Sequence, residues 1–232
     1  MRPNAFCVLL FSTAAWSFPP GLQAAPLAAR ADAGTGRAEY AMARYYSGVT
    51  GEAFDKAKAL DHMRRAAEHG HAPAQADLAF AYFNGSDLLP KDLNQSAAWF
   101  GKAAAGGSVI AQCMLGDFYR NGWGGLQTDP ERALGYYRKT ATLADRCAAK
   151  SQYALYVAYE SGSGVKRDLK TATRWLKKSA EAKNPQAQAT LGHNFVKGHG
   201  VARDEETGMD WIRKSREGVA PHDEVHDEHD HR

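Results

Sequence analysis

The chain has 232 residues, of which 44% are hydrophobic and 24% are charged, and its formal net charge is +3. This length suits one compact domain or a modest repeat array and is too short for a large multidomain enzyme. The balanced hydrophobic and charged fractions exclude wholesale disorder, and three cysteines are too few for a scaffold built on disulfides.

Residues 1–31 have the layout of a cleavable secretory signal and leader. Arg2 supplies a positive start, residues 5–16 form an apolar run, and Pro19–Gly21 break it before a stretch of small residues. Cleavage would fit after Ala24 or after Ala31. We therefore expect an exported chain, periplasmic or secreted, with no stable membrane insertion.

The body of the chain repeats one pattern five times. A glycine recurs at intervals of 37, 37, 40 and 36 residues, with an aromatic residue three positions before it and an aspartate six or seven positions after it. A large residue follows each aspartate by seven positions, and a base stands three positions beyond that. The glycines are Gly48, Gly85, Gly122, Gly162 and Gly198, the aspartates are Asp55, Asp92, Asp129, Asp168 and Asp204, and the large residues are His62, Trp99, Tyr136, Trp175 and Trp211.

Each recurring position of the pattern predicts part of a helical hairpin. A leucine and an aromatic residue four positions apart share one face of a first helix, and the glycine ends that helix. The aspartate is expected to cap a second helix through its carboxylate, and the recurring Trp or Tyr is expected to be the large apolar plug of that helix. His62 replaces the aromatic plug in the first copy, as expected of a terminal repeat.

Because one hairpin cannot bury its apolar face alone, the copies must stack. The sequence therefore predicts an all-α, right-handed superhelical solenoid of about five helix-turn-helix repeats, whose first helices line a concave surface. The repeat array is expected over residues 37–218, in segments of about 37–70, 71–107, 108–144, 145–183 and 184–218, followed by a disordered tail at 219–232.

These residues resemble the Sel-one-like repeat (SLR) family, a relative of the tetratricopeptide repeat. The fifth copy shows the pattern most fully, from Ala187 and Ala189 through Leu191-Gly192 and Gly198-His199-Gly200-Val201 to Asp204 and Trp211. The resemblance implies a non-enzymatic scaffold or adaptor that binds a protein or peptide partner. It names neither that partner nor the oligomeric state.

The spacing from the large residue to the next leucine is 16 in three junctions and 19 between Tyr136 and Leu155. Three extra residues therefore lie between the third and fourth repeats, and Cys147 stands among them. Export would leave Cys113 and Cys147 in an oxidising compartment, where they could pair as a disulfide. The alternative is a small buried cysteine at position 113 and a separate thiol at the junction.

Catalytic motifs are weak. Ser163-Gly164-Val165-Lys166 matches the S-x-x-K string of penicillin-interactive serine enzymes, but it falls in a loop between helices and lacks the partner motifs of those enzymes. No aromatic and basic platform for nucleic acid stands out either. We therefore expect no enzymatic activity and no nucleic-acid partner.

The C-terminal tail suggests a second function. His222, His226, His229 and His231 alternate with acidic residues, and imidazoles and carboxylates are ligands for Zn, Ni or Cu. The alternative hypothesis is therefore a periplasmic metal-binding or metal-responsive protein that acts through this tail, with such a metal as its only cofactor. A solvated tail without metal explains the same residues.

Partner-binding residues are expected on the first helices, beside the buried stripe. Bases also crowd the fourth repeat, from Lys166 to Lys178, and could attract an anionic partner. The residues predicted to line the concave groove are Arg44, Phe80, Asp117, Arg120, Asn121, His193 and Lys197.

Overall fold

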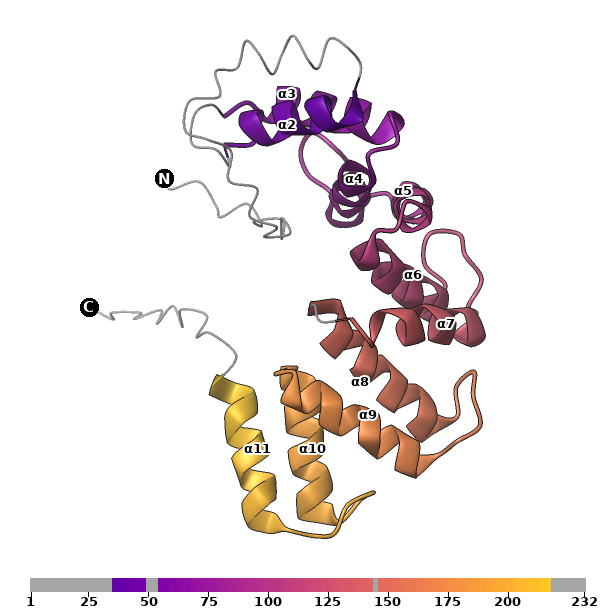
Figure 1. Cartoon of the computed structure of the whole chain (residues 1–232), viewed down its shortest axis with the longest axis vertical. Helices are drawn as coiled ribbons and strands as arrows, with labels where there is room; N and C mark the ends of the chain where they lie inside the picture. Colours follow the sequence, from indigo (N-terminus) through magenta and orange to yellow (C-terminus); the bar gives the residue numbers. More distant parts are fainter. Residues whose placement is uncertain (1–34, 49–53, 144–145, 218–232) are drawn as a thin grey trace, which may run out of the picture. The chain divides into compact units, whose positions relative to one another are not determined.

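The computed structural model describes residues 35–48, 54–143 and 146–217. These residues form two compact units that meet within one helix, the first ending at Tyr136 and the second beginning at Tyr137. Figure 1 shows the helices in chain order. The first unit contains α2 (Gly36–Tyr46), α3 (Lys56–Glu68), α4 (Ala72–Asn84), α5 (Leu93–Ala105), α6 (Val109–Asn121) and most of α7 (Pro130–Thr140), and the second contains α8 (Arg146–Ser161), α9 (Leu169–Glu181), α10 (Pro185–Lys197) and α11 (Glu205–Glu217).

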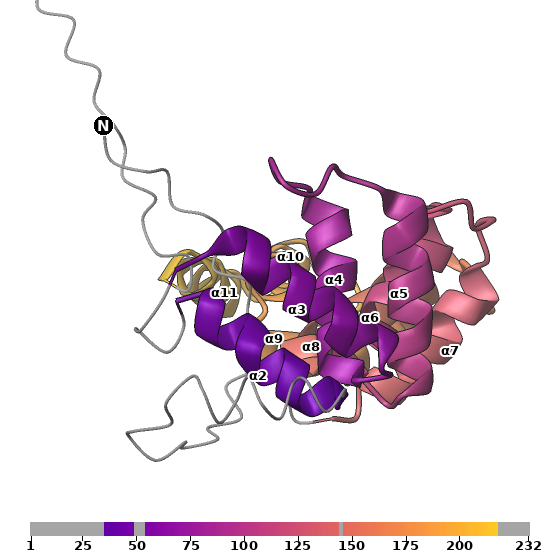
Figure 2. The same ribbon diagram turned by 90° about the horizontal axis from the view of Figure 1, so that it is seen from above.

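Within each unit, neighbours in sequence are neighbours in space. In the first unit α2 packs on α3, α3 on α4, α4 on α5 and α5 on α6, and Figure 2 shows α4 and α5 side by side. In the second unit α8 packs on α9, α9 on α10 and α10 on α11. The predicted all-α array of helix-turn-helix repeats is confirmed. None of the described helices carries an apolar run long enough to cross a bilayer.

The aspartate that precedes each second helix caps it, as the sequence predicts. The Asp92 carboxylate accepts hydrogen bonds from the backbone N–H groups of Asn94 and Gln95 at 2.8 and 3.0 Å, and Asp168 accepts one from Thr171 at 3.0 Å. Because the first N–H groups of a helix have no partner within the helix, these bonds fix where each second helix begins. The same arrangement holds at Asp55, Asp129 and Asp204.

Glycine ends the first helices in the way the sequence predicts. Gly122 adopts a left-handed conformation with φ of 68°, and its N–H donates to the Phe118 carbonyl. A similar conformation ends the second helices at Gly70 and Gly107, but Lys183 takes this role after α9 with φ of 62°. A side chain with a Cβ atom is strained there, so the fourth repeat carries a local cost that the others avoid.

The predicted plug of the second helix lies one residue further along the chain. Trp99, Trp175 and Trp211 are only half-buried, whereas Phe100 and Leu176, which follow the first two, are fully buried. The next residue points its side chain about 100° further round the helix, which is toward the neighbouring helices here. The prediction of the tryptophans as the buried plugs was therefore wrong in register.

The three extra residues before the fourth repeat lengthen its first helix. α8 contains 16 residues, whereas α4, α6 and α10 contain 13 each. All four helices end at the residue before the recurring glycine, so the insertion adds an N-terminal turn. Cys147 lies in that added turn.

A recurring glutamine joins each first helix to the repeat before it. The Gln75 side-chain amide donates to the Ala67 carbonyl at 3.0 Å, and Gln188 donates to the Ala180 carbonyl at 3.2 Å. Gln112 and Gln152 make the equivalent bonds to Ala104 and Ala141. The carbonyls of Ala67, Ala104 and Ala180 also accept a backbone N–H from the residue three positions later, so the glutamine adds a second hydrogen bond at the end of the second helix. The sequence pattern did not predict these bonds.

The first repeat replaces the recurring half-buried aromatic residue with a polar contact at His62. His62 Nδ1 lies 2.6 Å from the carboxylate of Glu39, which is buried on α2, and the Tyr46 ring stacks on the imidazole with 5.5 Å between centroids. Arg65 pairs with Asp61 and also approaches Glu39. This network fills the site that an aromatic residue occupies in the other repeats.

Candidate partner-binding surface

The first helices bury most of their surface and keep one narrow stripe exposed. In the second unit this stripe, called here the first-helix stripe, contains Val157 and Ser161 on α8 and His193 and Lys197 on α10. These residues are spaced by four along each helix, so they project from one side of it. Val157 is 38% exposed, which is high for a valine in a helix that is otherwise largely buried.

Polar contacts between α8 and α10 support the stripe from beneath. The Tyr153 hydroxyl lies 3.3 Å from the Thr190 hydroxyl, and the Tyr153 and Tyr156 rings pack with 5.7 Å between centroids. Burial raises the pKa of Tyr156 above its usual value. The two first helices of this unit therefore present one continuous surface, held together by side chains of both.

The first unit has an equivalent contact between α2 and α4. The Tyr40 hydroxyl donates a 2.7 Å hydrogen bond to Asp77, and burial raises the pKa of that carboxyl to about 6. Burial and the Asp77 carboxylate together raise the pKa of Tyr40. The nearby Arg44 guanidinium acts in the opposite direction on both groups, so the three side chains form one coupled polar cluster.

Five of the seven predicted groove residues lie in the first unit, where most of them make contacts within the protein. The Phe80 ring packs edge-on against Phe100 with 4.9 Å between centroids, and Asp117 is only 4% exposed. Arg120 pairs with the Asp117 carboxylate at 3.6 Å, and the Asn121 amide donates to the Asp117 carbonyl at 2.8 Å. Arg44 is half-buried beside Tyr40 and Asp77.

The other two, His193 and Lys197, lie on the first-helix stripe of the second unit, and both are exposed. His193 Nδ1 lies 2.7 Å from the Ala189 carbonyl of its own helix, which leaves Nε2 facing outward. The predicted groove residues therefore do not gather at one place. Those in the second unit are the better placed for a partner, because their side chains reach solvent.

The cysteine and metal predictions stay predictions. Cys113 is buried on α6 in the first unit, at a position where α4 and α10 carry alanines, and Cys147 is half-buried on α8 in the second unit. His222, His226, His229 and His231 lie outside the described residues. Over the residues that are described, no three His, Cys, Asp or Glu side chains converge as the ligands of a metal ion would.

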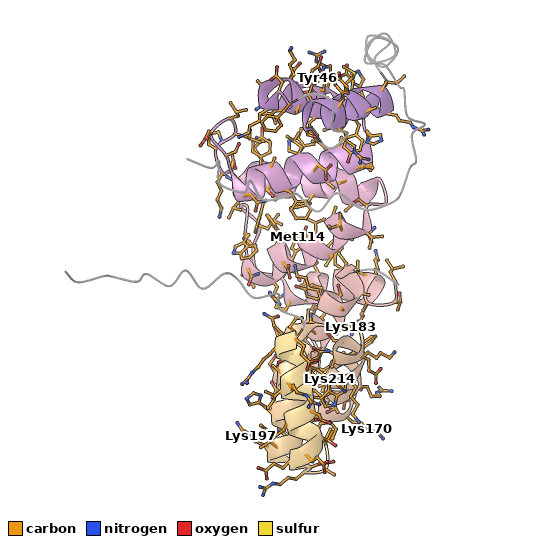
Figure 3. All side chains as sticks on the ribbon, turned by 90° about the vertical axis from the view of Figure 1, so that its left-hand side faces the viewer. Tyr46, Met114, Lys170, Lys183, Lys197 and Lys214 are labelled. Atoms are coloured by element: carbon orange, nitrogen blue, oxygen red, sulfur yellow. The ribbon has the colours of Figure 1, made fainter. Side chains whose placement is uncertain are left out.

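Charge is divided unequally between the units. Residues 35–48 and 54–136 contain ten Lys and Arg against ten Asp and Glu, whereas residues 137–143 and 146–217 contain sixteen against eight. The described part of the first unit is therefore neutral, and that of the second carries a net charge of +8. Figure 3 shows Lys170, Lys197 and Lys214 on three different helices of the second unit.

The recurring base of the second helix covers the face of the recurring tryptophan. Lys102 Nζ lies 3.9 Å from the centroid of Trp99, and the equivalent distances are 4.9 Å for Lys178 on Trp175 and 4.6 Å for Lys214 on Trp211. Such cation–π contacts contribute about 0.5–1 kcal/mol each at exposed sites. The spacing of three residues between ring and base is visible in the sequence, but a contact between the two was not predicted from it.

One protein-family model matches this chain along the whole repeat array. The family model described as "Sel1 repeat" matches five segments, residues 36–71, 72–108, 109–145, 149–184 and 185–218. Among solved structures, c5321, a protective antigen of uropathogenic Escherichia coli with an SLR fold, is 32% identical with a TM-score of 0.73, over 85% of this chain and 41% of that one. A Sel1 repeat protein from Oxalobacter formigenes is 24% identical, also with a TM-score of 0.73, over 85% of this chain and 79% of that one.

Curated proteins with similar sequences are longer. The chitin synthase regulator SKT5 of Saccharomyces cerevisiae is 29% identical over 69% of this chain and 23% of its own length. The uncharacterized protein NMB1327 of Neisseria meningitidis is 26% identical over 75% of this chain and 36% of its own length. The chain thus spans well under half the length of these relatives.

Proposed function

Because the chain belongs to the Sel1 repeat family, we propose that it is an exported, non-enzymatic scaffold that binds a protein or peptide partner on its first helices. Sel1 repeat proteins are generally scaffolds or adaptors for protein interactions. The observation that carries the proposal is the first-helix stripe of the second unit, where Val157, His193 and Lys197 remain exposed on helices whose other faces are buried.

The stripe has the composition of a docking surface for a polypeptide. Val157 offers an apolar contact and Lys197 supplies a positive charge. Because Nδ1 of His193 donates to the Ala189 carbonyl, the outward Nε2 of the neutral ring can accept a hydrogen bond. Interfaces typically combine an apolar centre with polar groups around it. The supporting Tyr153–Thr190 contact holds both helices in place before binding, which lowers the entropic cost of association.

Export is the second part of the proposal and rests on residues 1–31. It is tested by the N-terminus of the chain recovered from an envelope fraction. A start after Ala24 or Ala31 would support export with cleavage, and an intact Met1 in a cytoplasmic fraction would refute it.

The binding proposal is tested by site-specific photo-crosslinking in extracts of the native cell. A photoreactive phenylalanine analogue is placed at Val157 or at His193 on the stripe, and at Ala98 as a control. Ala98 is exposed on α5, a second helix of the neutral first unit, so it reports non-specific capture.

Both stripe positions are expected to trap the same protein band, and the control is expected to trap none. Equal bands from all three positions, or bands only from Ala98, would overturn binding on the first helices. The identity of the band by mass spectrometry would then name the partner.

A further inference from the structure

The second helix of the fourth repeat carries four bases on one side. Lys170, Arg174, Lys177 and Lys178, called here the α9 strip, are all exposed and fall within about 12 Å along the helix axis. Ala172 and Leu176, on the opposite side of α9, are fully buried. The strip is therefore a fixed array of positive charge on a helix whose position is set by its packing.

The other second helices have no such array at the same four repeat positions. Their net charge at these positions is at most +1, against +4 on α9. Where α9 carries Arg174, α3 and α11 carry acids, and these acids pair with neighbouring bases: Asp61 with Arg65, and Asp210 with Arg213 at 2.9 Å. The counterparts are Ala57, Asp61, Arg64 and Arg65 on α3, Asn94, Ala98, Gly101 and Lys102 on α5, Glu131, Gly135, Arg138 and Lys139 on α7, and Glu206, Asp210, Arg213 and Lys214 on α11.

No base of the strip forms a direct ion pair with a described residue of this unit. Arg174 donates to the Thr171 hydroxyl, which in turn donates to the Asp168 carboxylate, so Asp168 offsets part of the charge of Arg174 only, and the three lysines have no such neighbour among these contacts. Concentrated positive charge of this kind attracts an anionic partner and raises the rate of association.

The surroundings of the strip do not suit nucleic acid. Its three lysines and one arginine pair with carboxylates and phosphates alike, so the rings nearby decide between the two. The nearby rings are already covered, Trp175 by Lys178 at 4.9 Å and Phe195 by Lys177 at 6.0 Å, so they offer no open face for stacking bases.

We propose that the α9 strip is a docking site for an acidic segment of a partner polypeptide. This site is a second contact surface, in addition to the first-helix stripe. The proposal rests on the proposed function only because it takes the partner to be a protein. A segment of about four extended residues spans the strip, so acids at alternate positions of such a segment can each approach a base.

The test uses the full-length chain and a fluorescent oligoglutamate peptide of about ten residues, long enough to cover the strip. Fluorescence anisotropy compares the wild type with a strip variant, Lys170→Gln, Arg174→Gln and Lys177→Gln combined. Lys178 is kept because it covers Trp175. The matched control, Lys139→Gln, Lys166→Gln and Arg216→Gln, removes the same charge from exposed positions of the second unit outside the strip.

The strip variant is expected to bind the peptide about tenfold more weakly at low salt, and the control to stay within about twofold of the wild type. Wild-type binding should weaken as salt rises. Equal weakening in both variants, or none in the strip variant, would overturn the site. Circular dichroism of each variant checks that the fold is kept.

Two further arms exclude other occupants. If duplex DNA or phosphatidylglycerol vesicles bind in a strip-dependent way and oligoglutamate does not, the strip recognises phosphates and the proposal fails. If oligoglutamate binds only after the acids at 223, 224, 227, 228 and 230 are made neutral, the tail of the chain is the occupant and the proposal fails as well. Crosslinking at Val157 in the strip variant reports the first-helix stripe separately, so the two proposals can fail independently.

Discussion

Tyr40 on α2 donates a 2.7 Å hydrogen bond to the carboxylate of Asp77 on α4, which stands 37 residues later at the same position of the next repeat. Repeats are therefore joined along their first helices by side-chain contacts as well as by apolar packing. In this case the acceptor is a carboxyl group whose pKa is raised by burial, so its contribution to stability depends on pH.

Asp77→Asn is expected to remove a pH-dependent loss of stability. Burial raises the pKa of Asp77 from 3.8 to about 6, so the folded chain binds a proton that the unfolded chain has lost over that range. The contribution of this group to stability is thus largest below about pH 4 and is lost as pH rises through about 6. Asparagine keeps an acceptor for Tyr40 and carries no charge. The free energy of unfolding of the variant, relative to that of the wild type, should therefore increase by about 1–3 kcal/mol as pH rises from about 4 to above 6.

Urea unfolding at a series of pH values measures this difference. Asp87→Asn is the control, because it removes an exposed carboxylate from the same unit. Its curve should follow that of the wild type. Parallel curves for wild type and Asp77→Asn across the range would contradict the raised pKa.

Lys183→Gly is expected to stabilise the chain. Lys183 has φ of 62° where the first two repeats place Gly70 and Gly107, and the left-handed conformation costs a residue with a Cβ about 1–2 kcal/mol. Glycine removes that strain but loses more entropy on folding, so a net gain of about 0.5–1 kcal/mol in the free energy of unfolding is expected. Lys183→Ala, which keeps the Cβ, should show no such gain in the same urea titration.

Gln188→Ala is expected to cost about 0.5–1.5 kcal/mol, the net contribution of one hydrogen bond. The buried Gln188 amide donates to the Ala180 carbonyl and so joins α10 to α9, and that carbonyl keeps the backbone N–H of Lys183 at 3.0 Å as its other partner. Gln186→Ala changes an exposed glutamine two residues earlier in the same helix, and its cost should be within about 0.5 kcal/mol. Thermal unfolding of the two variants side by side measures the difference, and similar melting temperatures would show that the recurring glutamine is not a structural bond.

Two glycine substitutions should act in opposite directions. A Cβ at Gly192 would lie 2.6 Å from the Gly208 carbonyl and 2.7 Å from the Ile212 side chain, so Gly192→Ala must push α10 and α11 apart. Overpacking of this kind typically costs about 1–3 kcal/mol. At Gly135, within α7, a Cβ meets nothing within 4 Å, and Gly135→Ala should stabilise the helix by about 0.5–1 kcal/mol. Calorimetry that finds both variants shifted the same way would refute the close approach of α10 and α11.

Much of the fold could be predicted because its signals are local and periodic. Asp92 and Asp168 cap their helices with bonds to residues two or three positions away, and the spacing of Leu78 or Leu191 from the following glycine marks a buried helical face. Stacking then follows from the need to cover that face. The choice between Trp99 and Phe100 as the buried plug depended instead on the rotation of the helix against its neighbours, which the pattern alone did not fix.

The candidate surface was harder to predict, because exposure depends on contacts between repeats. Asp117 has the residue type and register of a groove residue, yet it is buried and paired with Arg120, whereas His193 at the same position of the fifth repeat is exposed. The glutamine bonds were missed since a polar residue on a buried face carries no hydrophobic periodicity. The crowding of bases in the fourth repeat was visible in the sequence, but only the structure showed that the four bases of the α9 strip form no direct ion pair with a described residue of their unit.

The aspartate that begins every second helix has a consequence for how such an array can diversify. The hydrogen bonds of this aspartate to the backbone and the packing of the buried side of the helix fix the position of the helix. The residues on the exposed side can therefore be substituted without moving it. One copy can therefore exchange its outer residues for those of another, as the contrast between α5 and α9 illustrates, without moving the helix that displays them. Because the helical framework stays the same when the exposed residues change, a new binding preference can arise in one repeat at a time.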